Sequence, residues 1–138
     1  MSRITARSSP WTRPDLTPGV TAAVLLGGLV SLAAGVWGFF APESFAAFVA
    51  FPYHQHFLHD VGAFQIGIGA TMLLALRWAD SVMVVLGGYV IGSGFHLVSH
   101  IIDRDIGGHS FDAPGIAILV IIGLIGMVAR IRGKQRCL

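Results

Sequence analysis

Two histidines near the end of an apolar segment are the first feature of the sequence that suggests chemistry. His96 and His100 lie four positions apart in the stretch GSGFHLVSH, residues 92–100. Side chains at this spacing share one face of a helix, and Gly88 and Gly92 continue that face. Small residues favour close helix packing in membranes, so we expect both imidazoles to point into the protein. Neutral imidazole commonly binds Zn, Cu or Fe, and the pair predicts part of a transition-metal site.

A second set of polar residues opens another apolar segment. His56 and His59 are three positions apart, and Asp60 follows directly. If the two segments form antiparallel neighbouring helices, the start of one lies beside the end of the other. We therefore predict a transition-metal site with the candidate ligands His56, His59, Asp60, His96 and His100. Asp60 would act as a ligand or as the acceptor that orients a ligating histidine. The loop residues His54 and His109 are secondary candidates.

The same residues allow other roles. Haem held by one histidine from each helix ranks second to a metal ion. Structural alternatives are hydrogen bonds between helices, pairing of Asp60 with a histidine or Arg104, and simple contacts with the membrane interface. A sensor of external pH is a further alternative, because histidine titrates near pH 6.5. The spacing lacks the glutamate of a His-Glu-x-x-His zinc protease helix, and the sequence assigns no reaction.

The composition is that of a membrane protein. Hydrophobic residues make up 54% of the 138 residues and charged residues only 12%, with a mean hydropathy of +0.75, whereas about a quarter of the residues of a soluble domain are charged. The single cysteine, Cys137, excludes an internal disulfide and a Cys-x-x-Cys motif. The net charge of +2 comes from cations in the tails and beside apolar segments, which gives no signal for nucleic-acid binding.

The apolar segments predict an all-α fold, an integral membrane up-down bundle of four helices. Each segment has about the length that a bilayer core requires, and the predicted spans are 18–40, 56–76, 81–102 and 114–131. A flexible basic tail, residues 1–17, precedes them and a basic tail, residues 132–138, follows. Between the first two spans, residues 45–51 are too short to cross and predict a short interfacial helix. Short connections make neighbouring spans antiparallel.

Positive charges predict the orientation of this bundle in the plasma membrane. Loops rich in arginine and lysine stay on the cytosolic side. Four spans place both termini on one side, together with Arg3, Arg7, Arg13, Arg77, Arg130, Arg132, Lys134 and Arg136. Only Arg104 falls opposite. Both termini should therefore be cytosolic, and all six histidines should lie toward the outer side.

Small residues at intervals of four predict where the helices pack closely. They are Gly27, Ser31 and Gly35 in the first span, Ala63, Gly67 and Thr71 in the second, and Gly88 and Gly92 in the third. Gln65, in the second span, is expected to bond between helices. The fourth span is rich in Ile, Leu and Val, so we expect it to face lipid or a partner.

Two short stretches resemble a known kind of protein. Residues 56–62 (HFLHDVG) and 95–100 (FHLVSH) look like the small four-span DoxX-like membrane proteins, particularly uncharacterised actinobacterial ones. That pattern has an Arg-Asp-x-Gly segment opening the second helix and a His-x-x-x-His pair late in the third. Here His59 stands in place of the arginine, and Phe95 where proline often precedes the first histidine. The resemblance covers the layout of residues 20–130, and it implies the four-helix fold and a loose association with membrane quinone oxidoreductases.

Three hypotheses about function follow. The first is a histidine cluster that binds a transition metal for metal handling or redox chemistry. The second is a non-catalytic accessory subunit or assembly factor of a larger membrane complex, or a homo-oligomer, docking through the fourth span. The third is a module that binds a small hydrophobic molecule or lipid between its helices, with the histidines as polar recognition groups.

Overall fold

The computed structural model describes residues 16–78 and 81–135, and within those ranges the protein is entirely helical. Its elements are α1 (Pro18–Phe40), α2 (Pro42–Phe48), α3 (Gln55–Ala75), α4 (Val82–Ile102) and α5 (Asp112–Gln135). In this part of the chain, four helices are long and apolar enough to cross a membrane. The predicted all-α membrane bundle is confirmed. Most of the predicted tail 1–17, part of the turn at 77–80 and residues 136–138 lie outside the described residues.

Local sequence signals explain where the helices begin. Thr17 caps α1 by accepting a hydrogen bond from the Val20 amide at 3.4 Å, and Pro18 occupies the first turn. The short helix α2 begins earlier than predicted, because Pro42 takes its first turn. Helix α5 is longer than the predicted span, since it starts at Asp112 and continues into the basic segment up to Gln135.

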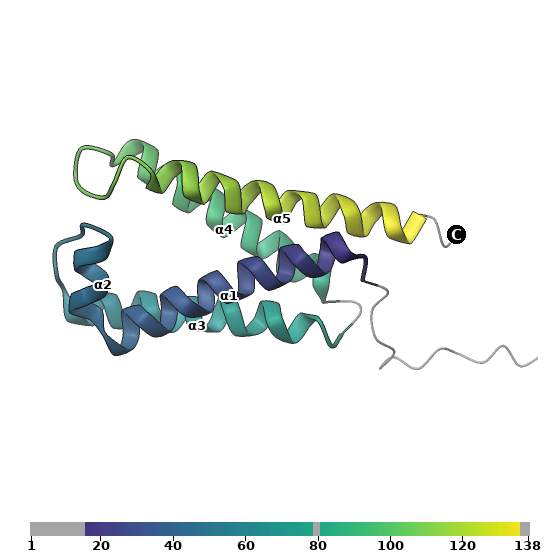
Figure 1. Ribbon diagram of the computed structural model, residues 1–138, viewed down its shortest axis with the longest axis horizontal. Coiled ribbons are helices and arrows are strands. Elements are labelled where there is room, and N and C mark those ends of the chain that lie inside the picture. Colours follow the sequence, from purple (N-terminus) through teal and green to yellow (C-terminus); the bar gives the residue numbers. More distant parts are fainter. Residues whose placement is uncertain (1–15, 79–80, 136–138) are drawn as a thin grey trace, which may run out of the picture.

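The long helices form two antiparallel pairs, α1 with α3 and α4 with α5 (Figure 1). The pairs converge at the end that holds the starts of α1 and α4 and the ends of α3 and α5, which we call the base. Here Gly126 of α5 lies against Ala23 of α1, where an added Cβ would come within 2.6 Å of the Ala23 Cβ. The opposite end, which we call the loop end, holds α2 and the α4–α5 loop.

The main core lies at the base, where all four long helices meet. Val20 and Val24 of α1, Met72 of α3, and Val82 and Leu86 of α4 are all essentially inaccessible. Inside a bilayer, lipid tails are as apolar as these side chains, so close packing holds the helices together more than exclusion of water does. The base therefore fixes how the two helix pairs are joined.

Candidate functional site

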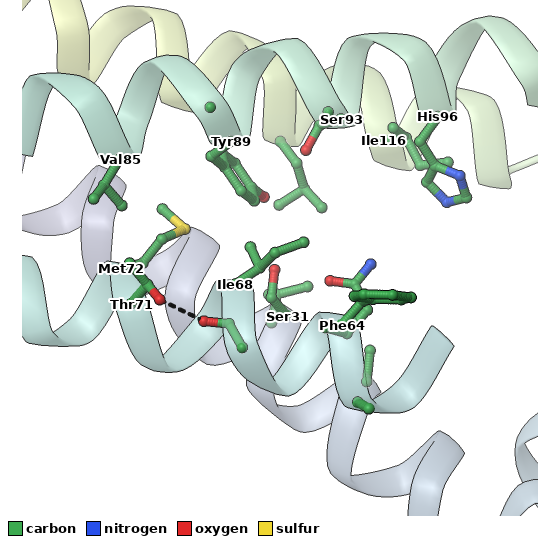
Figure 2. A pocket seen from close by; sticks show the side chains of 18 of the residues that line it. Ser31, Phe64, Ile68, Thr71, Met72, Val85, Tyr89, Ser93, His96 and Ile116 are labelled. Carbon is green, nitrogen blue, oxygen red and sulfur yellow. Dashed lines mark hydrogen bonds between the residues drawn. The ribbon is translucent and has the colours of Figure 1, made fainter. Parts of the chain in front are cut away.

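A cavity of about 840 Å³ lies between the two helix pairs. It lies between α3 and α4, with α1 behind it and Ile116 and Leu119 of α5 at its side (Figure 2). The bundle is therefore closed along the contact between α1 and α3 but open along much of the contact between α3 and α4.

Glycines create this space. If Gly67, Gly88 or Gly92 carried a Cβ, no atom would lie within 4 Å of it, and all three glycines line the cavity. The prediction that helices pack closely at these three glycines is wrong. A glycine permits a close approach only when another helix occupies the space, and here that space is left open.

The walls of the cavity are mostly hydrocarbon. Phe64 and Ile68 project from α3, and Val85 projects from α4, while Met72 closes the cavity toward the base. The rims are open, since Phe64 is 73% exposed and Val84 is 76% exposed. Such a lining suits an apolar molecule.

A few polar side chains interrupt this lining. Figure 2 shows His96 and Phe64 on opposite walls at one end of the cavity, while Thr71, Met72 and Val85 lie at the other. Gln65, next to Phe64, also lines the cavity, as do Ser93 and Ser31. The Thr71 hydroxyl is engaged locally, because it donates to the Gly67 carbonyl at 2.7 Å. Phe64 with its neighbour Gln65 thus lies at the His96 end, while Thr71 lies at the other end.

The loop end is joined by a contact between residues 48–50 and residues 107–109, which we call the clasp. The His109 Nε2 atom lies 3.1 Å from the Phe48 carbonyl oxygen, and the Gly108 amide donates to the Ala50 carbonyl at 3.2 Å. Both sides use left-handed backbone, with φ of +50° at Ala50 and +85° at Gly108. The clasp and the base thus join the two helix pairs at opposite ends of the bundle.

The structure brings His96 and His100 together. Their rings meet edge to face, with centroids 4.7 Å apart. His96 lines the large cavity, as the Gly88, Gly92, His96 face predicts, whereas His100 lines a smaller one of about 490 Å³ beside Arg104 and His109.

The histidines of the other helix pair have different surroundings. His54 caps α3, because its Nδ1 atom accepts a hydrogen bond from the Phe57 amide at 3.2 Å. His56 Nε2 lies 3.6 Å from Asp60 Oδ2, one turn further along, and both side chains are largely exposed. The His59 ring packs against Phe39, with centroids 5.1 Å apart.

The two sets of candidate ligands therefore stay on separate helix pairs. Among the described residues, no group of three or more His, Cys, Asp or Glu side chains is placed to hold a metal ion. The reason is the separation of α3 and α4 toward the loop end, which keeps His56, His59 and Asp60 on one side and His96 and His100 on the other. The metal site stays a prediction.

Sequence reasoning missed the residues that shape the cavity. It assigned Gln65 to packing and the glycines of α3 and α4 to helix contact, and it gave Ser93 no role. One signal of the cavity was present in the sequence. Gly88, Gly92 and His96 lie along one face of α4, so a face with very small side chains ends at a polar side chain.

No protein-family model matches the chain, and searches of curated proteins and of solved structures found no match either. The resemblance to DoxX-like proteins therefore stays a prediction that depends on two short stretches.

Proposed function

We propose that this membrane protein binds a small hydrophobic molecule or lipid in the cavity between α3 and α4. The observation that carries the proposal is the cavity itself, about 840 Å³ in volume, with apolar walls and a few polar groups near one end. Pockets for small molecules have volumes of about 300–1,000 Å³ and the same kind of lining.

The position of the cavity supports a ligand that arrives from the bilayer. α3 and α4 each have the length and composition of a membrane span, so the gap between them faces hydrocarbon. The exposed rim residues Phe64 and Val84 are apolar. A lipid-soluble molecule can enter through this open side without leaving an apolar environment.

Contacts between the two helix pairs at both ends of the bundle favour a small ligand over a helix from a partner protein. A spanning helix about 10 Å wide needs a groove that continues across the bilayer. The core at the base and the clasp at the loop end interrupt the gap between the helix pairs. A molecule that fits between these two boundaries matches this shape better.

The proposed orientation places both termini in the cytosol and the loop end outside the plasma membrane. Among the described residues, Arg77, Arg130 and Arg132 belong to the base end and Arg104 to the loop end. This distribution follows the preference of positive charges for the cytosolic side. His96 then lies in the outer half of the membrane.

Two glycines of α4 provide a matched test. Gly92 lines the cavity, whereas Gly94 does not, and an added Cβ would meet no atom within 4 Å at either position. Gly92→Leu should fill the cavity, while Gly94→Leu should leave it open. Leucine is a good helix former, so neither change should disrupt α4.

The readout is photolabelling in mild detergent by a long-chain alcohol that carries a diazirine. We expect labelled peptides from α3 and α4 in the wild type and in Gly94→Leu, and loss of most of this labelling in Gly92→Leu. Equal labelling of the two variants, or no saturable labelling of the wild type, would disprove the proposal.

The ring contact between His96 and His100 favours a second candidate function, binding of a transition metal. Two imidazoles from one helix can supply part of a ligand set. Metal and haem content of protein from metal-supplemented cells tests this candidate. We expect a stoichiometric metal that the double variant His96→Ala/His100→Ala loses, and metal-free wild type would refute it.

A further inference from the structure

We infer that the ligand carries an uncharged head group that both donates and accepts hydrogen bonds, and that this head group lies between Gln65 and His96. The inference rests on the proposed lipid-binding function and specifies the class of ligand. It comes from the chemistry and placement of the polar groups in the cavity.

Gln65 and His96 are suited to hold such a head group. An amide both donates and accepts hydrogen bonds, and so does a neutral imidazole, through its two ring nitrogens. Both residues line the cavity, Gln65 from α3 and His96 from α4. A hydroxyl placed between them can donate to one wall and accept from the other.

Two other polar side chains in the spans already bond to the backbone of their own helix. The hydroxyl of Thr71 donates to the Gly67 carbonyl, and that of Ser99 donates to the His96 carbonyl at 2.8 Å. Within residues 16–78 and 81–135, no hydrogen bond to protein is found for the Gln65 amide or the His96 ring nitrogens. Polar groups at membrane depth favour a partner strongly, and a ligand head group can provide one.

The lining argues against a charged head group. The polar residues in contact with the cavity are serine, threonine, tyrosine, glutamine and histidine, and the described lining includes no Asp, Glu, Lys or Arg. A carboxylate or phosphate bound here would lie in apolar surroundings without a cation in the lining, which is costly. An ammonium would have no carboxylate in the lining either, although Asp112 acts on His96 from outside it. An alcohol or a monoacylglycerol carries no such cost.

The apolar part of the ligand then extends toward the base. From His96 to Val85 the cavity follows α4 for eleven residues, which is about 16 Å at ~1.5 Å per residue. Ile68 and Met72 face this stretch from α3. A long hydrocarbon chain fits here better than a short one.

Native mass spectrometry of the full-length protein with four probes of equal chain length tests the head group. The probes are oleyl alcohol, oleate, oleylamine and 1-octadecene, which has no head group. We expect oleyl alcohol to bind about five- to tenfold more tightly than octadecene, the size of about one net hydrogen bond. Oleate and oleylamine should bind more weakly than the alcohol.

Variants localise the effect. Gln65→Leu and His96→Leu should each bring the affinity for oleyl alcohol close to that for octadecene, while octadecene binding stays at the wild-type level and shows that the fold is intact. The control His56→Leu changes a histidine that is 83% exposed and does not line the cavity, and it should leave both affinities unchanged.

The outcomes separate the two proposals. If oleate or oleylamine binds as tightly as oleyl alcohol, or if neither variant weakens the alcohol, the inference about the head group is wrong although the cavity binds lipid. If the wild type binds none of the four probes, including octadecene, the proposed function itself is wrong.

Discussion

The contact between α1 and α3 and the gap between α3 and α4 use the same residue type in opposite ways. Along the first contact, an added Cβ at Gly35 would lie 2.5 Å from the Ile66 amide nitrogen, and one at Gly69 would lie 2.6 Å from the Gly28 carbonyl oxygen. Along the gap, Gly67 and Gly88 would meet nothing within 4 Å. Glycine lets two backbones touch in one place and leaves room in the other.

This difference lies on two faces of the same helix. Gly69 of α3 faces α1, while Gly67, two residues earlier, faces the cavity. An α-helix turns about 100° per residue, so two positions are about 200° apart and the two glycines lie on nearly opposite faces of α3. Helix α3 is therefore a rigid wall that is fixed on one side by α1 and leaves its other side available.

The largest effect should come from a substitution in the closed contact. Gly69→Leu would drive a side chain into the backbone of α1 and should destabilise the protein by about 3 kcal/mol or more, since overpacking forces the helices apart. The matched variant Gly67→Leu points into open space and should cost little or nothing. Reversible unfolding in mixed micelles measures both. Similar losses for the two variants would contradict the proposed contrast.

The base should show the next largest effect, because it joins the two helix pairs. Leu86 is completely buried in the core at the base, whereas Val84, on the same helix, is 76% exposed at the rim of the cavity. Truncation of a fully buried leucine leaves a hole, and we expect Leu86→Ala to cost about 2–4 kcal/mol. Val84→Ala should change the unfolding free energy by less than about 0.5 kcal/mol. Equal losses would show that the base does not hold the pairs together.

The sequence predicted the parts of this arrangement that depend on hydropathy and helix period. The apolar runs predicted four spans, with 18–40 matching α1, and the spacing of Gly88, Gly92 and His96 placed the imidazole on the face of α4 that lines the cavity. It did not predict the cavity, because spacing within one helix does not say what faces it. Gly35 meets Gly62 and Gly28 meets Gly69 only through the register of α1 and α3.

The histidines show the same limit. Their positions near the loop end follow from their places at helix ends and in loops, but their partners depend on loop geometry. His54 caps α3 and His109 bonds to Phe48, and neither contact has a signature in the sequence. The predictions that concern partners, an accessory role in a larger complex and the DoxX-like resemblance, stay predictions.

A smaller effect should come from the clasp, which joins the two helix pairs at the loop end. His109→Ala removes the hydrogen bond to the Phe48 carbonyl and should cost about 1 kcal/mol. The amide bond between Gly108 and Ala50 would then open more often, so hydrogen exchange at residues 107–109 should become faster. His56→Ala, which changes an exposed histidine of the other helix pair, should leave this exchange unchanged. Unchanged exchange in His109→Ala would show that the clasp does not depend on this side chain.

The smallest expected change in stability comes from Gly88→Ala, and this variant tests why the gap between α3 and α4 is open. In the middle of a helix, glycine is less stable than alanine by about 0.5–1 kcal/mol, and at Gly88 an added methyl group would touch nothing. Gly88→Ala should therefore raise the unfolding free energy by about that amount, while the smaller cavity should bind the photolabel more weakly. Gly94→Ala should give the same gain in stability without changing the labelling, because Gly94 lies outside the cavity. A gain in stability together with a loss of binding at Gly88 alone would mean that the open gap lowers stability and serves the ligand. Equal labelling of the two alanine variants would instead assign the glycines of α4 no part in binding.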